Sequence, residues 1–469
     1  MTIPPSAPRA VHRALILLIA VVVAAVAAEA QERALSIDEA LALARTNSEA
    51  VRMKSLEVQK SSDRLVAARA HAFPSLILDA SGSYLANPPA GITLKTGELG
   101  RITTPLGTLI IPPSDVVVME GAEHTYFKAN ATLSQPLLTW GKIPNAIALA
   151  EREVAASGAE LARQQRDIEK QVHAAYFGAQ LAETSLPLLR EMEEIGEAIL
   201  RDRSSAFEAG ASTRQDVLEA EAGLSSLSAR LIGAEEARAT ALESLSLLTD
   251  AALDGTTLST SFRASLPGLD EQALKAAAVK SSPELQGARE RAAQARTKLS
   301  LEKGGAMLLP DLSLAITLGV TGQKVPFASS DWSDTWDWDL VVSLGTRANL
   351  FDAGASWAKI REAGRDVEGA ALGIAQLEKA IGARVRTAVQ QARQKRAAVE
   401  EARAKAALAE EQAKNARVSF ENELATREEM NRAALGLLSA RLAEAAAQHD
   451  LEAALEDIEY LTGERLGGT

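Results

Sequence analysis

The stretch Phe207–Asp216, FEAGASTRQD, is matched 213 residues later by Phe420–Glu429, FENELATREE. Each stretch reads as a turn followed by Thr-x-x-Asp or Thr-x-x-Glu, the capping-box pattern that begins a helix. Self-similarity at a fixed spacing indicates that one structural unit occurs twice. We therefore expect Thr213 with Asp216, and Thr426 with Glu429, to begin two equivalent returning helices.

The same spacing recurs in the segments that precede these turns. Apolar residues seven apart form one seam in both copies: Ile147, Val154, Leu161, Ile168 and Ala175, then Ile360, Val367, Ile374, Ile381 and Ala388. They predict helices over about 142–204 and 355–418, each about 95 Å long at 1.5 Å per residue. A seven-residue apolar repeat also predicts left-handed supercoiling. Pro187 interrupts only the first helix and is expected to kink it.

Upstream of the long helices the two copies differ in length. Phe73-Pro74-Ser75-Leu76 matches Leu309-Pro310-Asp311-Leu312 at a spacing of 236, so the first copy has 23 more residues, which fall in the loop 86–124. Each copy reads as helix, strand, loop, strand, very long helix, turn and returning helix. We assign residues 31–250 to the first copy, 251–268 to a connector and 269–469 to the second copy. The loop is expected to be partly ordered and external.

Composition excludes several classes of function. The formal net charge is −12, and phosphate binding requires clustered Lys and Arg, so nucleic acid is not an expected partner. The chain has no cysteine and only five scattered histidines, which leaves no zinc-type cluster and no disulfide. No phosphate loop or set of nucleophile and base appears. We therefore expect no enzyme activity, no metal and no cofactor.

The first thirty residues resemble a secretory signal. Arg9, His12 and Arg13 precede an apolar run over 14–28, and Ala28-Glu29-Ala30 fits a cleavage site before Gln31. A membrane anchor is the alternative, but about 15 apolar residues are fewer than the ~20 that a spanning helix needs. No later segment is apolar enough for a spanning helix, so any membrane crossing would use strands.

Four segments alternate apolar and polar residues as strands do. The apolar sets are Leu76, Leu78, Ala80, Gly82 and Tyr84; Phe127, Ala129, Ala131 and Leu133; Leu312, Leu314, Ile316, Leu318 and Val320; and Trp338, Leu340, Val342 and Leu344. This pattern is typical of a lipid-facing barrel, with Trp336 and Trp338 as candidates for an interfacial aromatic girdle. An ordinary amphipathic sheet covering a soluble core would show the same alternation.

Four strands cannot close a barrel, and open sheet edges are not tolerated in lipid. If the strands cross a membrane, several chains must share one barrel. Two chains would give eight strands, whose interior is largely filled by side chains, whereas three would give twelve and room for a pore. Strand count therefore favours a trimer.

These residues resemble the TolC-like outer-membrane efflux protein family over essentially the whole mature chain. The marks of the family are Leu35-Ser36-Ile37-Asp38-Glu39-Ala40-Leu41, Phe73-Pro74-Ser75-Leu76, Ser134-Gln135-Pro136-Leu137 with Gly141, Leu350-Phe351-Asp352 with Gly354, Gly210 through Leu218, and Leu461-Thr462-Gly463. Each motif alone is weak, but their order and twofold recurrence make the resemblance specific.

The resemblance implies a mainly α-helical, TolC-like fold with an internal twofold repeat. Three chains would share a 12-stranded outer-membrane barrel, continued by a long α-helical barrel in the periplasm, with 251–268 in the equatorial region. It implies a passive exit duct of a tripartite efflux or type I secretion system. The implied partners are outer-membrane lipid, a periplasmic adaptor and an inner-membrane pump of the resistance-nodulation-division, ABC or related type.

The resemblance also implies roles for residues near the two turns. Acidic residues past the second turn would line the periplasmic aperture. This indicates Glu429, with Asp216 and Glu219 at the same depth and Arg432 where the family can show a second acid. The helix tips would bind the adaptor. The candidates are Phe207, Gly210, Ser212, Thr213 and Arg214 in the first copy and Phe420, Glu423, Thr426 and Arg427 in the second.

Alternatives remain for these residues and for the chain. Asp216 and Glu429 could serve only as helix caps, and Arg214 and Arg427 could be solvated. The family commonly has Gly at the turn, whereas the second copy has Glu423, which would be strained in a turn that requires a positive φ. A soluble periplasmic coiled-coil scaffold or adaptor would share the signal and the heptads. The transported substrate and the resting state of the aperture do not follow from the sequence.

Overall fold

The computed structural model describes residues 34–253, 256–263, 268–306, 310–326, 328, 330–347 and 351–466. The expected signal peptide lies outside the described residues. The chain divides into two units. The strand unit consists of residues 60–154 and 292–369, and the helical unit of residues up to 59, 155–291 and 370 onward. The helices α3 (Glu49–Ala70), α4 (Lys142–Glu208), α7 (Pro283–Ala306) and α8 (Ala355–Glu421) contribute to both.

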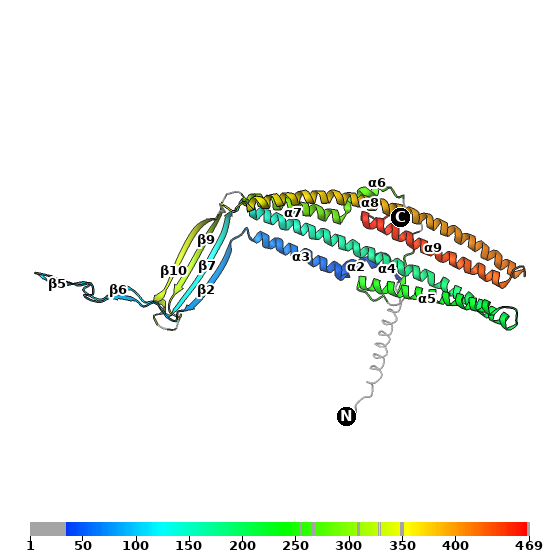
Figure 1. Ribbon diagram of the computed structural model, residues 1–469, viewed down its shortest axis with the longest axis horizontal. Coiled ribbons are helices and arrows are strands. Elements are labelled where there is room, and N and C mark those ends of the chain that lie inside the picture. The colour runs from blue at the N-terminus through cyan, green and yellow to red at the C-terminus, as the bar shows by residue number, and fades with distance from the viewer. Residues whose placement is uncertain are drawn as a thin grey trace, which may run out of the picture. The chain divides into compact units, whose positions relative to one another are not determined.

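The strand unit contains one four-stranded antiparallel sheet. Its strands are β2 (Ser75–Tyr84), β7 (Thr125–Leu138), β9 (Asp311–Gly322) and β10 (Trp336–Arg347). They lie side by side in the order β10-β9-β7-β2 (Figure 1). Each copy of the repeat supplies one antiparallel pair, and β7 and β9 join the two pairs. The four predicted strands are therefore confirmed, and β2 and β10 form the two edges of the sheet.

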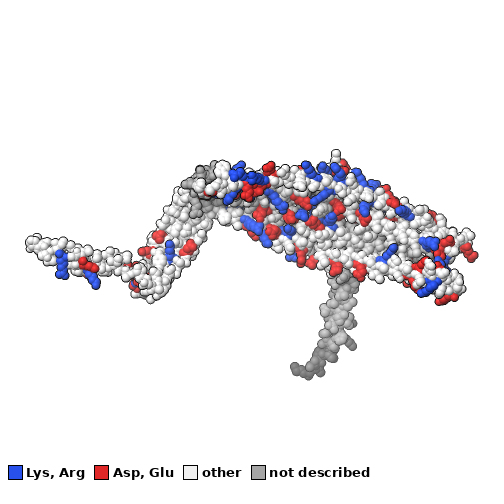
Figure 2. Space-filling view, viewed as in Figure 1, with Lys and Arg blue, Asp and Glu red and all other residues white. Residues whose placement is uncertain are grey.

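Side chains in this sheet are sorted by face. The residues aligned across the four strands form rows on the apolar face: Leu76, Leu133, Ile316 and Val342; then Leu78, Ala131, Leu318 and Leu340. The next row along, on the other face, is polar and consists of Asp79, Asn130, Gly319 and Asp339. The apolar face is open, since Leu78 is 72% and Trp338 is 73% exposed. The sheet therefore does not cover a soluble core within the described chain. Figure 2 shows its visible surface as mostly uncharged.

The loop between β2 and β7 forms two small ribbons. The strands β3 (Ile92–Leu94) and β6 (Val116–Met119) pair, as do β4 (Arg101–Thr104) and β5 (Gly107–Ile110). The expectation that this loop is partly ordered is confirmed. No equivalent ribbon joins β9 to β10 in the described chain, where the connection carries only a short 3₁₀ turn at Trp332–Thr335.

The helical unit is built from two hairpins of matched length. Helices α4 and α8 each have 67 residues, and the returning helices α5 (Arg214–Thr249) and α9 (Arg427–Thr462) each have 36. The predicted long helices are confirmed and continue about one turn further than expected. The shorter helices also match, since α2 (Ile37–Asn47) and α6 (Glu271–Ser281) each have 11 residues. Figure 1 shows the two hairpins side by side, with both turns at the same end.

Thin apolar seams hold the helices together. Every residue of the predicted seven-residue seam is buried or half-buried, including Ile168 and Ile381 in the two main core clusters. A third cluster joins α4 to α9 through Leu189, Met192 and Leu438. Pro187 lies on the exposed side of an unbroken α4. The rest of the helical surface carries interspersed charges of both signs (Figure 2).

The described part of the connector is tied to the helices. The strand β8 (Thr257–Leu258) pairs in parallel with β1 (Ala34–Leu35). Arg263 binds Glu452 and Glu459 of α9 at 2.7 and 2.6 Å. The buried Tyr176 hydroxyl of α4 donates to the Leu35 carbonyl at 2.8 Å. These contacts hold residues 34–35 and the described part of the connector against the helices of both copies.

Among the described residues, no helix is both long enough and apolar enough to cross a bilayer.

Candidate functional site: the hairpin tips

The first tip ends α4 with a tight left-handed turn. The Ala211 amide donates to the Ala206 carbonyl at 2.7 Å, and the Gly210 amide donates to the Phe207 carbonyl at 3.0 Å. This is the Schellman arrangement, which satisfies the last carbonyls of a helix and places one residue at positive φ. That residue is Gly210, with φ of 74°. Glycine has no Cβ, so it adopts this conformation without steric cost.

The second tip has the same backbone with a different residue. The Leu424 amide donates to the Ser419 carbonyl at 2.8 Å, and the Glu423 amide to the Phe420 carbonyl at 3.0 Å. Glu423 has φ of 58°. The sequence left two outcomes for this turn, either a different backbone or a strained one. The backbone is retained, so Glu423 occupies a left-handed conformation that costs L-residues other than Gly roughly 1–2 kcal/mol.

Both returning helices begin with the predicted capping boxes. The Thr213 hydroxyl accepts from the Asp216 amide, and the Asp216 carboxylate accepts from the Thr213 amide at 2.8 Å. Thr426 and Glu429 repeat this exchange, with the Glu429 carboxylate 2.8 Å from the Thr426 amide. Capping of both helices is therefore confirmed.

The caps lower the pKa of both carboxyl groups. The backbone hydrogen bond from Thr213 is the main cause that lowers the pKa of Asp216 to about 2, aided by the hydroxyls of Thr213 and Ser212. The backbone hydrogen bond from Thr426 likewise lowers the pKa of Glu429, with a smaller contribution from Arg432. Because their pKa is lowered, both carboxyl groups remain negative at neutral pH.

Ion pairs connect the two hairpins near their tips. Arg203 of α4 lies 2.6 Å from Glu428 of α9, which also binds Arg432 at 2.9 Å. Asp202 of α4 lies 3.4 Å from Arg427. Arg432 thus pairs directly with Glu428, one turn before it, and Arg427 is paired rather than simply solvated. Asp202, Arg203 and Glu428 were not among the predicted site residues.

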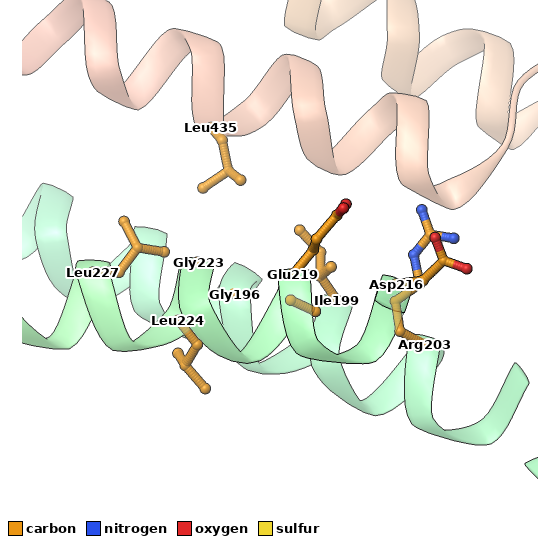
Figure 3. A pocket seen from close by; sticks show the side chains of 10 residues that line it. Gly196, Ile199, Arg203, Asp216, Glu219, Gly223, Leu224, Leu227 and Leu435 are labelled. Carbon is orange, nitrogen blue, oxygen red and sulfur yellow. The ribbon is translucent and has the colours of Figure 1, made fainter. Parts of the chain in front are cut away.

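A cavity lies behind the first tip, between α4, α5 and α9. Its volume is 380 Å³, and its lining includes Asp216, Glu219 and Arg203. Figure 3 shows Asp216 beside Arg203 and the carboxylate of Glu219 pointing toward α9, with Leu224, Leu227 and Leu435 further along. Glu219 also accepts a hydrogen bond from Gln215 at 2.9 Å. The cavity therefore has a charged end near the tip and an apolar end behind it.

The structure separates the predicted site residues into two groups. Asp216 and Glu219 line the cavity, together with the unpredicted Arg203, whereas Glu429 and Arg432 lie around the second cap. Of the two repeated phenylalanines, Phe207 is exposed, while Phe420 is half-buried and lines a second cavity of 750 Å³ between α4, α8 and α9. Gly210, Thr213, Arg214, Glu423 and Thr426 are exposed, Ser212 is half-buried, and Arg427 carries the Asp202 pair.

Comparison with known proteins identifies the family. A family model described as "Outer membrane efflux protein" matches residues 40–250. This part of the chain, a little under half of it, is therefore similar to the outer membrane efflux protein family. The resemblance predicted from the motifs is confirmed, and it supports an efflux role in the outer membrane. A comparison with curated proteins gave no match.

Solved structures of outer-membrane channels share the fold of this chain. The Campylobacter jejuni CmeC outer membrane channel is 17% identical with a TM-score of 0.71, covering 91% of this chain and 85% of that one. The outer membrane protein VceC of Vibrio cholerae is 17% identical with a TM-score of 0.68, covering 92% and 97%. The open state of the Neisseria gonorrhoeae MtrE channel is 17% identical with a TM-score of 0.65, covering 92% and 89%. The predicted TolC-like fold is confirmed.

Proposed function

We propose that this efflux protein is the outer-membrane exit duct of a tripartite efflux or type I secretion system. It conducts substrates passively from an inner-membrane pump to the exterior. The observation that carries the proposal is the four-stranded sheet, which has an exposed apolar face, a polar face and two edges unpaired within the described chain. Such a sheet is stable in lipid only if other chains complete it.

A homotrimer is the assembly that best completes the sheet. Three copies contribute twelve strands, and a barrel of that size has room for a pore along its polar face. The polar row Asp79, Asn130, Gly319 and Asp339 then faces the lumen, and the row containing Leu78 and Leu340 faces lipid. The helical unit extends into the periplasm.

The hairpin tips form the periplasmic aperture in this proposal. Asp216, Glu219 and Glu429 supply fixed negative charge, because the caps keep Asp216 and Glu429 ionised. Arg432 adds a positive charge next to Glu428 and weakens the preference for cations that an acidic ring would give. Capping and aperture lining are compatible, since a cap carboxylate at a helix tip is exposed.

The outer surface of the tips is the proposed contact for a periplasmic adaptor. Its residues are Phe207, Gly210, Ser212, Thr213 and Arg214 on the first tip, and Phe420, Glu423, Thr426 and Arg427 on the second. The exposed Phe207 ring is the strongest single candidate, because an exposed aromatic residue is a common anchor in protein interfaces. The adaptor in turn connects the duct to a pump of the resistance-nodulation-division, ABC or related type.

The first experiment is fractionation of cells that express the full chain, followed by detergent extraction and mass determination. Recovery from the outer membrane as a particle of about three chains is the expected result. Recovery as a soluble periplasmic species would overturn the duct and favour a coiled-coil scaffold or adaptor.

The aperture is tested by single-channel conductance of Glu429→Gln in planar bilayers. Gln at this position keeps the capping box but removes the charge. The expected result is a lower cation-to-anion permeability ratio than the parent protein. Glu400→Gln is the matched control, because Glu400 is an exposed α8 residue away from the tips. An equal change in both variants, or none in Glu429→Gln, would remove Glu429 from the aperture.

A further inference from the structure

The helices α4 and α9 share a buried pair of titratable side chains, His173 and Glu456. The Nδ1 atom of His173 lies 3.1 Å from the Oε2 atom of Glu456, and the two side chains are 13% and 11% exposed. Neither atom has another hydrogen-bond partner among the described residues. Burial disfavours the charged form of each group, and no further hydrogen bond offsets that cost at these two atoms. The charge of the pair therefore depends on how many protons the two groups hold.

The matching positions of the other copy differ. The residue 213 positions after His173 is Arg386, which lies 3.1 Å from Glu271 of α6. The residue 213 positions before Glu456 is Glu243, which is exposed on α5. Arginine stays charged in proteins, so the contact of Arg386 does not depend on pH in the way that a histidine contact does. A buried titratable pair that the repeat does not require is a candidate for a functional role.

Titratable side chains from five parts of the chain lie around the pair, next to a cavity of 110 Å³. They are Asp38 and Arg45 of α2, Arg166 and Glu169 of α4, Arg263 of the connector, Glu452, Glu459 and Tyr460 of α9, and Glu464 and Arg465 after α9. Several of them already bind one another, as Arg45 binds Glu169 at 2.7 Å. Arg465 likewise lies 2.5 Å from Asp38. A net charge on the pair would therefore compete with ion pairs that already exist.

Burial keeps the pair without net charge at neutral pH. It is the main cause that lowers the pKa of His173 to about 4, and Arg263 and Arg465 lower that pKa further. Burial also raises the pKa of Glu456 to about 9, with Glu459 as the next cause. One proton is therefore held on Glu456, and its carboxyl group faces a neutral imidazole.

We propose that the His173–Glu456 pair makes the packing of α9 on α4 depend on pH, because the contact is most stable while the pair holds one proton. A second proton would place a buried positive charge beside Arg263 and Arg465. Loss of the one proton would place a buried negative charge beside Glu459 and Glu169. Either change favours local opening of the contact, since opening returns the charged group to water. The inference goes beyond the exit duct and does not depend on how many chains assemble.

The two pKa shifts set the pH range in which the contact is most stable. The pKa of His173 is lowered from 6.5, so its contribution is complete above pH 6.5 and is lost as the pH falls toward 4. The pKa of Glu456 is raised from 4.5, so its contribution is complete below pH 4.5 and is lost as the pH rises toward 9. Between pH 4.5 and 6.5 the two changes cancel. The contact should therefore be constant in that range and weaken above pH 6.5.

Amide hydrogen exchange of the detergent-extracted full chain tests the proposal. Exchange is measured by mass spectrometry from pH 4.5 to 8.5 and corrected for its intrinsic pH dependence. The reporter is the α9 segment 452–462, and the repeat segment 239–249 of α5 is the reference within each sample. In Glu456→Gln the amide can still donate to His173 but cannot ionise, and His173→Gln removes the imidazole. His71→Gln is the matched control, because His71 is exposed.

The parent chain should exchange at a constant rate in the α9 segment from pH 4.5 to 6.5. Above pH 6.5 exchange should accelerate by up to about tenfold for each pH unit. Glu456→Gln should lose this acceleration and exchange faster as the pH falls from 6.5 toward 4.5, because the shift of His173 is then no longer cancelled. His173→Gln should exchange faster from pH 4.5 upward, and His71→Gln should follow the parent chain.

Constant exchange up to pH 8.5 in the parent chain would overturn the proposal. An acceleration above pH 6.5 that persists in Glu456→Gln would also overturn it, since another group would then be titrating. These two measurements decide the question even if His173→Gln does not fold. Neither measures conduction or the number of chains, so a negative result would leave the proposed exit duct intact.

Discussion

The two hairpins of the helical unit have helices of equal length and the same caps, but they differ at the turn and on one flank. The first turn has Gly210 at positive φ, and the second has Glu423 in the same conformation. On the second returning helix, α9, residues 431, 438, 445 and 452 are buried on the side that packs against α4. The matching residues of the first returning helix, α5, are 218, 225, 232 and 239, and all four are exposed. Duplication has therefore preserved the backbone more closely than the side chains, since hydrogen bonds set the backbone and neighbours select the side chains.

The largest expected difference is in the free energy of unfolding, between a substitution on α9 and one at the matching position of α5. Leu438 is buried against Leu189 and Met192, so Leu438→Ala should lower the free energy of unfolding by about 2–5 kcal/mol. Its repeat partner Ser225 is exposed, and Ser225→Ala should change it by less than about 0.5 kcal/mol. Denaturant unfolding of the extracted protein, followed by circular dichroism, measures both. Similar losses of unfolding free energy in both variants would mean that α5 and α9 are equally packed at these positions.

A smaller effect separates the two turns. Glu423→Gly should stabilise the second tip by about 1 kcal/mol, because it relieves a left-handed conformation. Gly210→Ala should destabilise the first tip by a similar amount through φ alone, since a Cβ at Gly210 meets no atom within 4 Å. Hydrogen exchange of the Leu424 and Ala211 amides reports each turn. Faster exchange at Leu424 in Glu423→Gly would contradict the argument.

The cross-hairpin ion pair should contribute less. Both partners are partly exposed, and a double-mutant cycle of Arg203→Ala and Glu428→Ala should give a coupling of about 0.2–1 kcal/mol that falls as salt rises. The corresponding residues Ala416 and Gln215 carry no charge, so the pair exists only where α4 meets α9. A coupling that is unaffected by salt would exclude an electrostatic origin.

The smallest expected effect is the response of the caps to acid. The pKa of Asp216 is lowered to about 2 in the folded chain, from a usual value of 3.8. Its stabilising effect is therefore present above pH 3.8 and is lost as the pH falls toward 2. The pKa of Glu429 is also lowered from its usual value of 4.5, so the sign is the same there. Amide exchange at Asp216, corrected for intrinsic pH dependence, should accelerate below pH 3.8, and Asp216→Asn should remove that acid-dependent step.

Much of this fold followed from the sequence because its determinants are local. The strands at Leu76 and Trp338 appeared as alternation, the long helices as heptads, and the capped starts as Thr213 and Thr426. The repeat allowed each motif to be checked against its copy. The strained turn at Glu423 was one of the two outcomes expected from the sequence, because Gly210 at the matching position indicates a turn with a positive φ.

The ion pairs and the strand alignment could not be predicted, because they depend on how the two repeat copies pack against each other. The Arg203–Glu428 and Asp202–Arg427 pairs join residues more than 200 positions apart. Of these four residues only Arg427 has a charged counterpart in the other copy, Arg214, so the repeat does not mark either pair. The alignment of strand residues into rows likewise depends on how β7 pairs with β9, which no motif specifies. The strongest available signal was the presence of Arg203 and Glu428 where the repeat has Ala416 and Gln215.

The equal lengths of the two hairpins limit where this chain can gain or lose residues during evolution. One residue inserted into α8 would rotate everything after it by about 100° and advance it by 1.5 Å relative to α4. The buried residues of α9 would then turn away from α4, and the second hairpin turn would no longer lie beside the first. The loop between β2 and β7 already holds ribbons that the other copy lacks, so it imposes no such penalty. Insertions and deletions should accumulate in that loop and be purged from all four hairpin helices.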